Sequence, residues 1–187
     1  MSRREQSARK ISTCAQALTA SKGFEGFTME DLAGAAGVSR RTLFNYFDSK
    51  LEAVLGPEPE LDTEMTAEFR AGGPTGHLFE DLGHVAHTHF ARMPQNRELI
   101  TTMRQVIRNP RIMAACHDRF EKLAEDGLAM IKEREGSHYD ERQARVAISM
   151  LLVLCQLALD GFVATTDDRT FTDHYDECLS AARAVLA

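Results

Sequence analysis

The chain has 187 residues, of which 43% are hydrophobic and 27% are charged. This balance is typical of a soluble globular protein and excludes a disordered or collagen-like chain. The formal net charge is −6, but residues 1–50 carry eight Lys or Arg against five Asp or Glu, whereas the other 137 residues carry 14 against 23. A net charge of +3 on the N-terminal segment and −9 on the rest predicts that the N-terminal end meets an anionic partner.

Neither a signal peptide nor a membrane span is predicted. Arg9 and Lys10 interrupt the N-terminal segment where a signal peptide would be apolar. The longest apolar run, residues 146–159, contains Ser149 and Gln156 and is shorter than the ~20 residues that a membrane-spanning helix needs. We therefore expect a cytoplasmic protein with no membrane partner.

The four cysteines are widely spaced and form no Cys-x-x-Cys pair; they are Cys14, Cys116, Cys155 and Cys178. Each falls at a core-facing helical position in the predicted pattern. Free, buried thiols in a cytoplasmic protein are expected, and a disulfide framework is not.

Apolar residues recur at helical spacing along nearly the whole chain, and no segment shows sustained strand alternation, which predicts an all-α fold. A first helix is marked by Ala8, Ile11, Ala15 and Leu18 and ends before Gly23. Thr28 opens a capping-box-like Thr-Met-Glu-Asp sequence, which predicts a short second helix to Ala36. A third helix is predicted from the Ser39 cap to about Phe47, and a fourth from near Lys50, capped by Asp48 or Ser49.

The remaining helices are longer and are separated by clear breaks. Pro57 and Pro59 should break or kink the fourth helix, because proline lacks an amide donor and clashes with the preceding turn. The pattern resumes over about 60–70 and continues over about 75–93, 96–108, 110–135, 140–165 and 172–186. We expect about nine helices in two domains: residues 1–50, a three-helix helix-turn-helix DNA-binding domain, and residues 51–187, a helical regulatory domain.

Residues 28–50, TMEDLAGAAGVSRRTLFNYFDSK, hold the most informative pattern. Two short helices flank Ala36-Gly37-Val38-Ser39, a tight turn with glycine where the turn needs it. The second of these helices is predicted to turn Leu43, Phe44 and Phe47 inwards, leaving its polar residues outside. That division suits a recognition helix in the major groove, but a capped helix pair with an ordinary solvated face would share it.

The segment GFEGFTMEDLAGAAGVSRRTLFNYFDSKLEAVL resembles the DNA-binding domain of the TetR family of bacterial transcriptional regulators. The similarity covers about residues 8–55 and many positions in order, including Gly23, Phe27-Thr28, Asp31-Leu32-Ala33, Ala36 to Ser39, Thr42-Leu43-Phe44, Tyr46-Phe47 and Ser49-Lys50. The rest of the chain agrees with the family in length and helical pattern only.

The resemblance implies a role for each matching residue. Thr28 would place a hydroxyl and an amide against a phosphate at a helix N-terminus. Ser39 would cap the recognition helix, and Arg40, Arg41 and Thr42 would contact base edges of double-stranded operator DNA. Asn45, Tyr46 and Lys50 would contact phosphates. Arg41 stands where many family members have a small residue, so the operator sequence cannot be inferred.

The family counterpart of residues 56–187 binds a small-molecule effector and dimerises. Residues 140–165 are apolar nearly all round and must be covered on most sides. We expect a homodimer interface from Leu157, Phe162, Phe171, Tyr175, Cys178, Leu179 and Ala182, although the same pattern suits an intramolecular core. Symmetry would then place two recognition helices about 34–36 Å apart on a palindromic operator.

The expected function is that of a repressor released from its operator by a largely apolar effector, through differential binding to two conformations. A pocket is predicted from Met103, Ile107, His117, Phe120, Met150 and Leu154, although the sequence pattern favours ordinary core for the apolar residues among them. Pro57 and Pro59 depart from the continuous helix that usually links pocket and DNA-binding domain in this family. Activation instead of repression stays open, because operator position decides it.

Two other functions compete with this one: an enzyme, and a helical interaction module that has lost DNA binding, against which the intact surface from Ser39 to Tyr46 argues. His84, His87 and His89 with Glu80 could suggest a metal site, but His89 points about 200° away from His87 around a helix, so no metal and no cofactor are predicted. No nucleophile elbow, phosphate-binding glycine loop, Cys–His pairing or HExxH helix is present, so an enzyme is not expected. Metal-dependent turnover would favour the enzyme instead.

Overall fold

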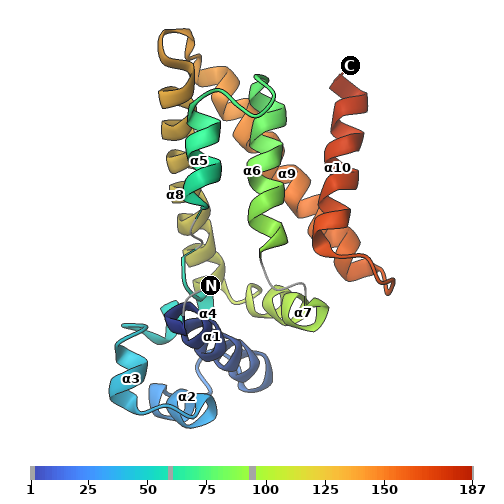
Figure 1. Ribbon diagram of the computed structural model, residues 1–187. Coiled ribbons are helices and arrows are strands. Elements are labelled where there is room, and N and C mark those ends of the chain that lie inside the picture. Colours follow the sequence, from blue (N-terminus) through green and yellow to red (C-terminus); the bar gives the residue numbers. More distant parts are fainter. Residues whose placement is uncertain (1–2, 59–60, 93–95, 187) are drawn as a thin grey trace. The chain divides into compact units, whose positions relative to one another are not determined.

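The computed structural model describes residues 3–58, 61–92 and 96–186. Over these residues it contains ten α-helices, one short 3₁₀ turn and no β-strand (Figure 1), which confirms the predicted all-α fold. The chain forms two compact units, and each combines separate segments: unit 1 holds Met1–Pro59 and Glu98–Phe120, and unit 2 holds Glu60–Arg97 and Glu121–Ala187. The predicted domain boundary after residue 50 stays a prediction.

Unit 1 contains four N-terminal helices, α1 (Arg3–Lys22), α2 (Met29–Ala36), α3 (Arg40–Phe44) and α4 (Lys50–Leu55). It also contains nearly all of α7 (Arg97–Val106) and the first part of α8 (Pro110–Glu135). The predicted caps form: the Ser49 hydroxyl accepts a hydrogen bond from the Glu52 amide at 3.2 Å and begins α4. Gly56 ends α4 with φ +79°, a left-handed value that glycine adopts without a Cβ clash.

The core of unit 1 is drawn from all of these helices. Its buried residues are Ala8, Ile11, Ala15, Phe24, Phe27, Leu32, Ala33, Ala36, Leu43, Phe47, Ala53, Val54, Val106 and Ile112. The side-chain amide of Gln16 donates to the Val54 carbonyl at 2.9 Å, which fixes α1 to α4 inside this core. The helix-turn-helix segment therefore lies on a well-packed support.

Unit 2 contains α5 (Thr63–Arg70), α6 (Leu78–Ala91), the rest of α8, a 3₁₀ turn at Gly136–His138, α9 (Glu141–Ala164) and α10 (Phe171–Leu186). One buried cluster joins α5, α6, α8 and α9 through Met65, Phe69, Leu82, Val85, Met130, Ile131, Ala144 and Ala147. Helix α10 runs beside α6 and α9 (Figure 1) and contributes an aromatic cluster, in which Tyr175 contacts Phe90 edge to face at 5.0 Å.

A buried ion pair joins three helices of unit 2. The Arg134 guanidinium lies 2.6 Å from the Asp81 carboxylate, and the two side chains are 3% and 0% exposed. Arg134 also donates to the carbonyls of Phe69, Gly72 and Gly73, at the end of α5 and in the loop after it. The other Asp81 oxygen accepts from the amide and hydroxyl of Thr75 at 2.7 Å. Because both charges are hydrogen-bonded, their burial is compatible with a stable fold.

Several predicted helix limits differ from the observed ones. The third helix ends at Phe44 instead of Phe47, and α6 begins at Leu78 instead of about Thr75. Thr75 instead bonds to Asp81, which explains the late start of α6. The helix limit predicted at Met93 lies outside the described residues, as do Pro59 and Glu60. Asn109-Pro110 opens α8 as predicted, since proline suits the first turn of a helix.

The residues expected at the dimer interface differ in their exposure within the single chain, and the interface stays a prediction. Phe162, Phe171, Tyr175 and Leu179 are between 0% and 7% exposed within the single chain. A residue buried against its own chain has no free surface for a partner, so these four belong to the core of unit 2. Leu157 is 53% exposed, while Cys178 and Ala182 are half-buried.

All four cysteines are free and half-buried. Burial raises the pKa of the Cys155 thiol to about 11, and it also raises the pKa of Cys116 and of Cys178. Thiols with raised pKa values carry little thiolate at neutral pH and are poor nucleophiles.

Helix α9 has two contrasting faces. Ala144, Ala147 and Ala158 are at most 7% exposed, whereas Val146 and Val153 are 53% and 55% exposed. Among the described residues, α9 is the one helix long and apolar enough to cross a membrane by length and composition alone, with a mean hydropathy of 2.2. Its exposed apolar face is therefore a candidate contact surface.

Candidate nucleic-acid interface

A full capping box begins α2. The Thr28 hydroxyl accepts from the Asp31 amide at 3.2 Å, and the Asp31 carboxylate accepts from the Thr28 amide and hydroxyl, both at 2.8 Å. These bonds lower the pKa of Asp31, the bond from the Thr28 amide most of all. Since both Thr28 donors are engaged, a phosphate at this helix end would meet the first-turn amides of Met29 and Glu30, which have no carbonyl partner inside the helix.

The turn between α2 and α3 depends on Gly37. This residue has φ 68° and ψ 36°, and its amide donates to the carbonyls at the end of α2. The Val38 amide donates to the Ala33 carbonyl at 3.0 Å and closes the turn. The left-handed conformation costs glycine least, which is why the turn forms at this residue.

Ser39 begins α3 as predicted. Its hydroxyl accepts from the Thr42 amide at 3.0 Å and lies 2.8 Å from the Thr42 hydroxyl. Thr42 is half-buried and already engaged with the cap. A base contact from Thr42 therefore has to compete with, or extend, an existing hydrogen bond.

The buried face of α3 is narrower than predicted. Leu43 and Phe47 are 0% and 5% exposed, but Phe44 is 38% exposed, so the expectation that Phe44 points inwards was wrong. Leu43 and Phe47 are four residues apart and share a direction, whereas Phe44 is turned about 100° from Leu43. The Arg40 guanidinium lies 5.5 Å from the centre of the exposed Phe44 ring.

Two arginines stand at the exposed N-terminal end of α3. Arg40 forms a 2.9 Å ion pair with Glu30, and the side chains are 68% and 56% exposed. Exposed pairs of this kind contribute about 0–1 kcal/mol, so DNA phosphates or base edges can displace Glu30. Arg41 is exposed and has no ion pair among the described residues. Glu30 was not among the residues that the sequence singled out.

The last residues of the motif are placed differently from one another. Asn45 is exposed at the end of α3, in keeping with a phosphate contact. Tyr46 is half-buried and packs against the core of unit 1. Lys50 is also half-buried: its ammonium donates to the Phe27 carbonyl at 2.9 Å and lies within 5 Å of the Phe24 and Phe27 ring centres. Lys50 thus holds the loop before α2, with two ammonium hydrogens left for other acceptors.

The site combines two capped helices, a glycine turn and an exposed arginine pair, supported by buried aliphatic and aromatic side chains. These features define a helix-turn-helix DNA-binding protein. Residues 13–54 match the sequence model of a family described as bacterial regulatory proteins, tetR family. The N-terminal segment therefore matches the DNA-binding domain of the TetR family of transcriptional regulators. No curated protein sequence matched it significantly.

Solved structures resemble the whole chain. A candidate TetR-family transcriptional regulator from Mesorhizobium loti is 21% identical, with a TM-score of 0.59, over 99% of this chain and 98% of the other. The similarity supports the overall fold. The TetR-family regulator PfmR from Thermus thermophilus is also 21% identical, over 91% and 97% of the two chains, but its TM-score of 0.44 is too low to support an argument.

The residues predicted to form an effector pocket are divided between the units. Met103, Ile107, His117 and Phe120 lie in unit 1, where Ile107 packs against the core and Phe120 is 52% exposed. Met150 and Leu154 lie in unit 2, on α9. The effector pocket stays a prediction.

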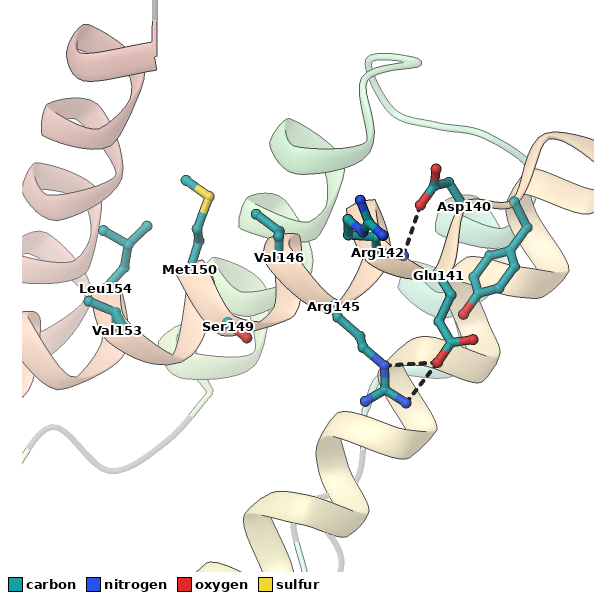
Figure 2. Close-up of a pocket in the computed structure, with 10 residues that line it drawn as sticks. Asp140, Glu141, Arg142, Arg145, Val146, Ser149, Met150, Val153 and Leu154 are labelled. Carbon is teal, nitrogen blue, oxygen red and sulfur yellow. Dashed lines mark hydrogen bonds and ion pairs between the residues drawn. The ribbon is translucent and has the colours of Figure 1, made fainter.

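Met150 and Leu154 line an open groove of about 1160 Å³ along α9. Figure 2 shows the charged residues Asp140, Glu141, Arg142 and Arg145 at one end, with Glu141 and Arg145 paired at 2.9 Å. Val146, Met150 and Val153 line its apolar part. The spacing of these apolar residues along one helix face was visible in the sequence, but their exposure was not.

Two of the side chains considered for metal binding have other partners. His87 lies 2.8 Å from Asp176, and Glu80 pairs with Arg183 through both carboxylate oxygens. Among the described residues, no group of three His, Cys, Asp or Glu side chains is arranged to hold a metal ion.

Proposed function

We propose that the protein is a homodimeric repressor that binds a palindromic operator through α3 and is released by a largely apolar small molecule. The observation that carries the proposal is the free N-terminal end of α3, where Arg40 and Arg41 are exposed on a rigidly capped turn. Arginine forks pair with guanine in the major groove more often than any other side chain does. Displacing Glu30 from Arg40 costs little, so the surface is ready to bind.

Dimerisation is proposed through the apolar stripe of α9, defined as Val146, Met150, Val153 and Leu157. These residues follow a spacing of four, three and four, and Val146, Val153 and Leu157 are each more than half exposed. Such a stripe is typical of a helix that packs against another helix. In a two-fold dimer the α9 stripe would meet its own copy, and the copy would cover the apolar part of the groove.

A membrane would cover the α9 stripe less well than a second chain. The opposite face of α9 is enclosed by the protein itself, as the burial of Ala144, Ala147 and Ala158 shows. Lipid therefore cannot surround this helix. The exposed Gln156 also lies within the apolar run, where a bilayer would leave its amide without partners.

The experiment is a gel-shift titration of the full chain against DNA from upstream of its own coding region, at several salt concentrations. We expect specific binding that weakens steeply with salt, because displaced counterions accompany each phosphate contact. A small-molecule screen on the resulting complex then tests release. Binding that is absent, or indifferent to sequence and salt, would contradict the proposed function.

A further inference from the structure

Helix α3 exposes one apolar side chain beside its polar ones. Over residues 40–47, which hold α3 and the turn after it, the exposed side chains are Arg40, Arg41, Phe44 and Asn45. They form one continuous arc, because Phe44 and Arg40 are four residues apart and share a direction, while Arg41 and Asn45 lie next to them around the helix. Phe44 is thus the single apolar group of this exposed arc.

Packing within unit 1 does not account for the position of Phe44. Leu43 and Phe47 are 0% and 5% exposed and belong to the buried core of this unit, whereas Phe44 is 38% exposed and is not one of the core residues. A single exposed apolar residue is common on protein surfaces, so exposure alone assigns no role. What distinguishes Phe44 is its place among the side chains that we propose to face DNA.

The Phe44 ring has a defined polar neighbour. The Arg40 guanidinium lies 5.5 Å from the ring centre, within the range of a cation–π contact. Four residues span about 6 Å along a helix, and neighbouring base pairs are about 3.4 Å apart. A group contacted by Phe44 would therefore lie within about two base pairs of the base pair that Arg40 contacts.

The major groove offers one apolar group to such a ring, which is the 5-methyl group of thymine. The other groups that distinguish the base pairs in this groove are hydrogen-bond donors and acceptors. A phenyl ring can pair with none of these groups, nor with a phosphate oxygen, because it has neither a donor nor an acceptor. Contact with the methyl group would instead remove apolar surface of both partners from water.

We propose that Phe44 is a specificity-determining residue that recognises the 5-methyl group of a thymine. The inference rests on the proposed function, because it needs α3 to enter the major groove. It adds a base preference that differs from that of the arginines, since a guanidinium pairs with guanine and Phe44 selects thymine. A two-fold dimer would contact one such thymine in each half-site.

The test removes the methyl group from the DNA and the ring from the protein. The full chain is titrated by fluorescence anisotropy against a labelled duplex selected for tight binding from a random-sequence pool, so the natural operator is not needed. Each thymine of the duplex is then replaced in turn by deoxyuridine, which lacks only the methyl group.

The same series is measured with three variants. Phe44→Ala removes the ring, and Phe44→Leu keeps an apolar side chain in its place. Met113→Ala is the matched control, because Met113 is an exposed apolar residue of unit 1 outside the helix-turn-helix segment. Circular dichroism shows whether each variant keeps its helices.

We expect the parent to lose about fourfold in affinity when deoxyuridine replaces the contacted thymine of either half-site, as for the loss of one buried methyl group. Phe44→Ala should bind the unsubstituted duplex more weakly, and deoxyuridine at these positions should then change its affinity by less than about 1.5-fold. Phe44→Leu should keep a loss of about twofold or more, and Met113→Ala should behave as the parent.

The inference is overturned if the parent responds to no deoxyuridine, or if Phe44→Ala keeps the response of the parent. The scan of the parent needs no variant, so a folding defect in Phe44→Ala does not remove the test. A parent chain that selects no sequence from the pool would contradict DNA recognition itself. Tight binding without any response to the methyl groups would overturn the role of Phe44 and leave the proposed function intact.

Discussion

At the scale of single residues, Arg41 is the side chain that we propose to read the operator most directly. It is exposed at the first turn of α3 and has no competing ion pair among the described residues. Arg40 by contrast must first leave Glu30. The two arginines are therefore not equivalent, and the free one is the better probe of the interface.

We predict that Arg41→Ala weakens operator binding by about 1–3 kcal/mol, since one bidentate base contact is lost. Fluorescence anisotropy with labelled operator DNA measures the change. The matched control is Arg70→Ala, which removes the same charge from an exposed ion pair with Glu133 in unit 2. Equal losses from both substitutions would show that general charge, and not the α3 surface, determines affinity.

Asp81 shows how one buried charge depends on its partners. Burial alone would raise the pKa of this carboxyl group, but the Thr75 hydroxyl and amide and the Arg134 guanidinium outweigh it, and the pKa lies below its ordinary value. A lowered folded-state pKa means that the carboxylate stabilises the fold at neutral pH. The contribution is complete above the unfolded-state pKa of about 3.9 and is lost as the pH falls through the folded-state value.

We predict that Asp81→Asn lowers the free energy of unfolding by up to about 3–5 kcal/mol, because the buried Arg134 loses its buried partner and keeps only the partly exposed Glu135. Urea unfolding followed by circular dichroism at pH 7 measures the loss. Below about pH 4 the parent and the variant should converge, as the parent carboxylate becomes protonated. A difference that stayed constant down to pH 2 would contradict the assignment of this stability to the ion pair.

At the scale of helices, local signals predicted a large part of the fold. Thr28, Gly37, Ser39 and Pro110 each act within a few residues, so their sequence context suffices to place the ends of α2, α3 and α8. The inward direction assigned to Phe44 was wrong, because Phe44 is turned about 100° around α3 from the buried Leu43.

Contacts between residues far apart in the chain could not be predicted from these local sequence signals. Nothing near Ile112 in the sequence indicates that it completes the core beneath α3, nearly 70 residues earlier in the chain. The apolar faces around Phe162 and Tyr175 were expected at a dimer interface, with an intramolecular core as the alternative, but both residues are buried within the single chain. The exposure of Arg40, Arg41 and Asn45 was predicted from helix periodicity alone. Thr42 and Tyr46, which were expected on the same face, are half-buried.

At the scale of the whole molecule, a palindromic operator requires two copies of α3 held by a dimer. The α9 stripe is the surface that we propose for that contact within unit 2. Fixing two recognition helices about 34–36 Å apart lets each enter the same face of the DNA one helical turn from the other. An effector that binds the two dimer conformations unequally then changes operator affinity by that difference alone.

We predict that Val153→Glu/Leu157→Glu converts the dimer into a monomer, because four carboxylates would gather at the two-fold axis of an apolar contact. Sedimentation equilibrium measures the mass, and operator affinity should fall with it. Met113→Glu adds a carboxylate at an equally exposed apolar residue of unit 1 and should leave the dimer intact. A dimer that persists in the double variant would show that the contact lies outside the α9 stripe. Recovery of the parent chain in the membrane fraction would instead indicate that lipid covers this stripe.

The most direct measurement is a series of operators in which each base pair is replaced in turn, with binding by the parent chain compared with that by Arg41→Ala. The parent should discriminate strongly at two symmetric positions, one in each half-site, and Arg41→Ala should lose preference at both while keeping it elsewhere. Unchanged discrimination at every position would show that α3 does not read the operator through Arg41.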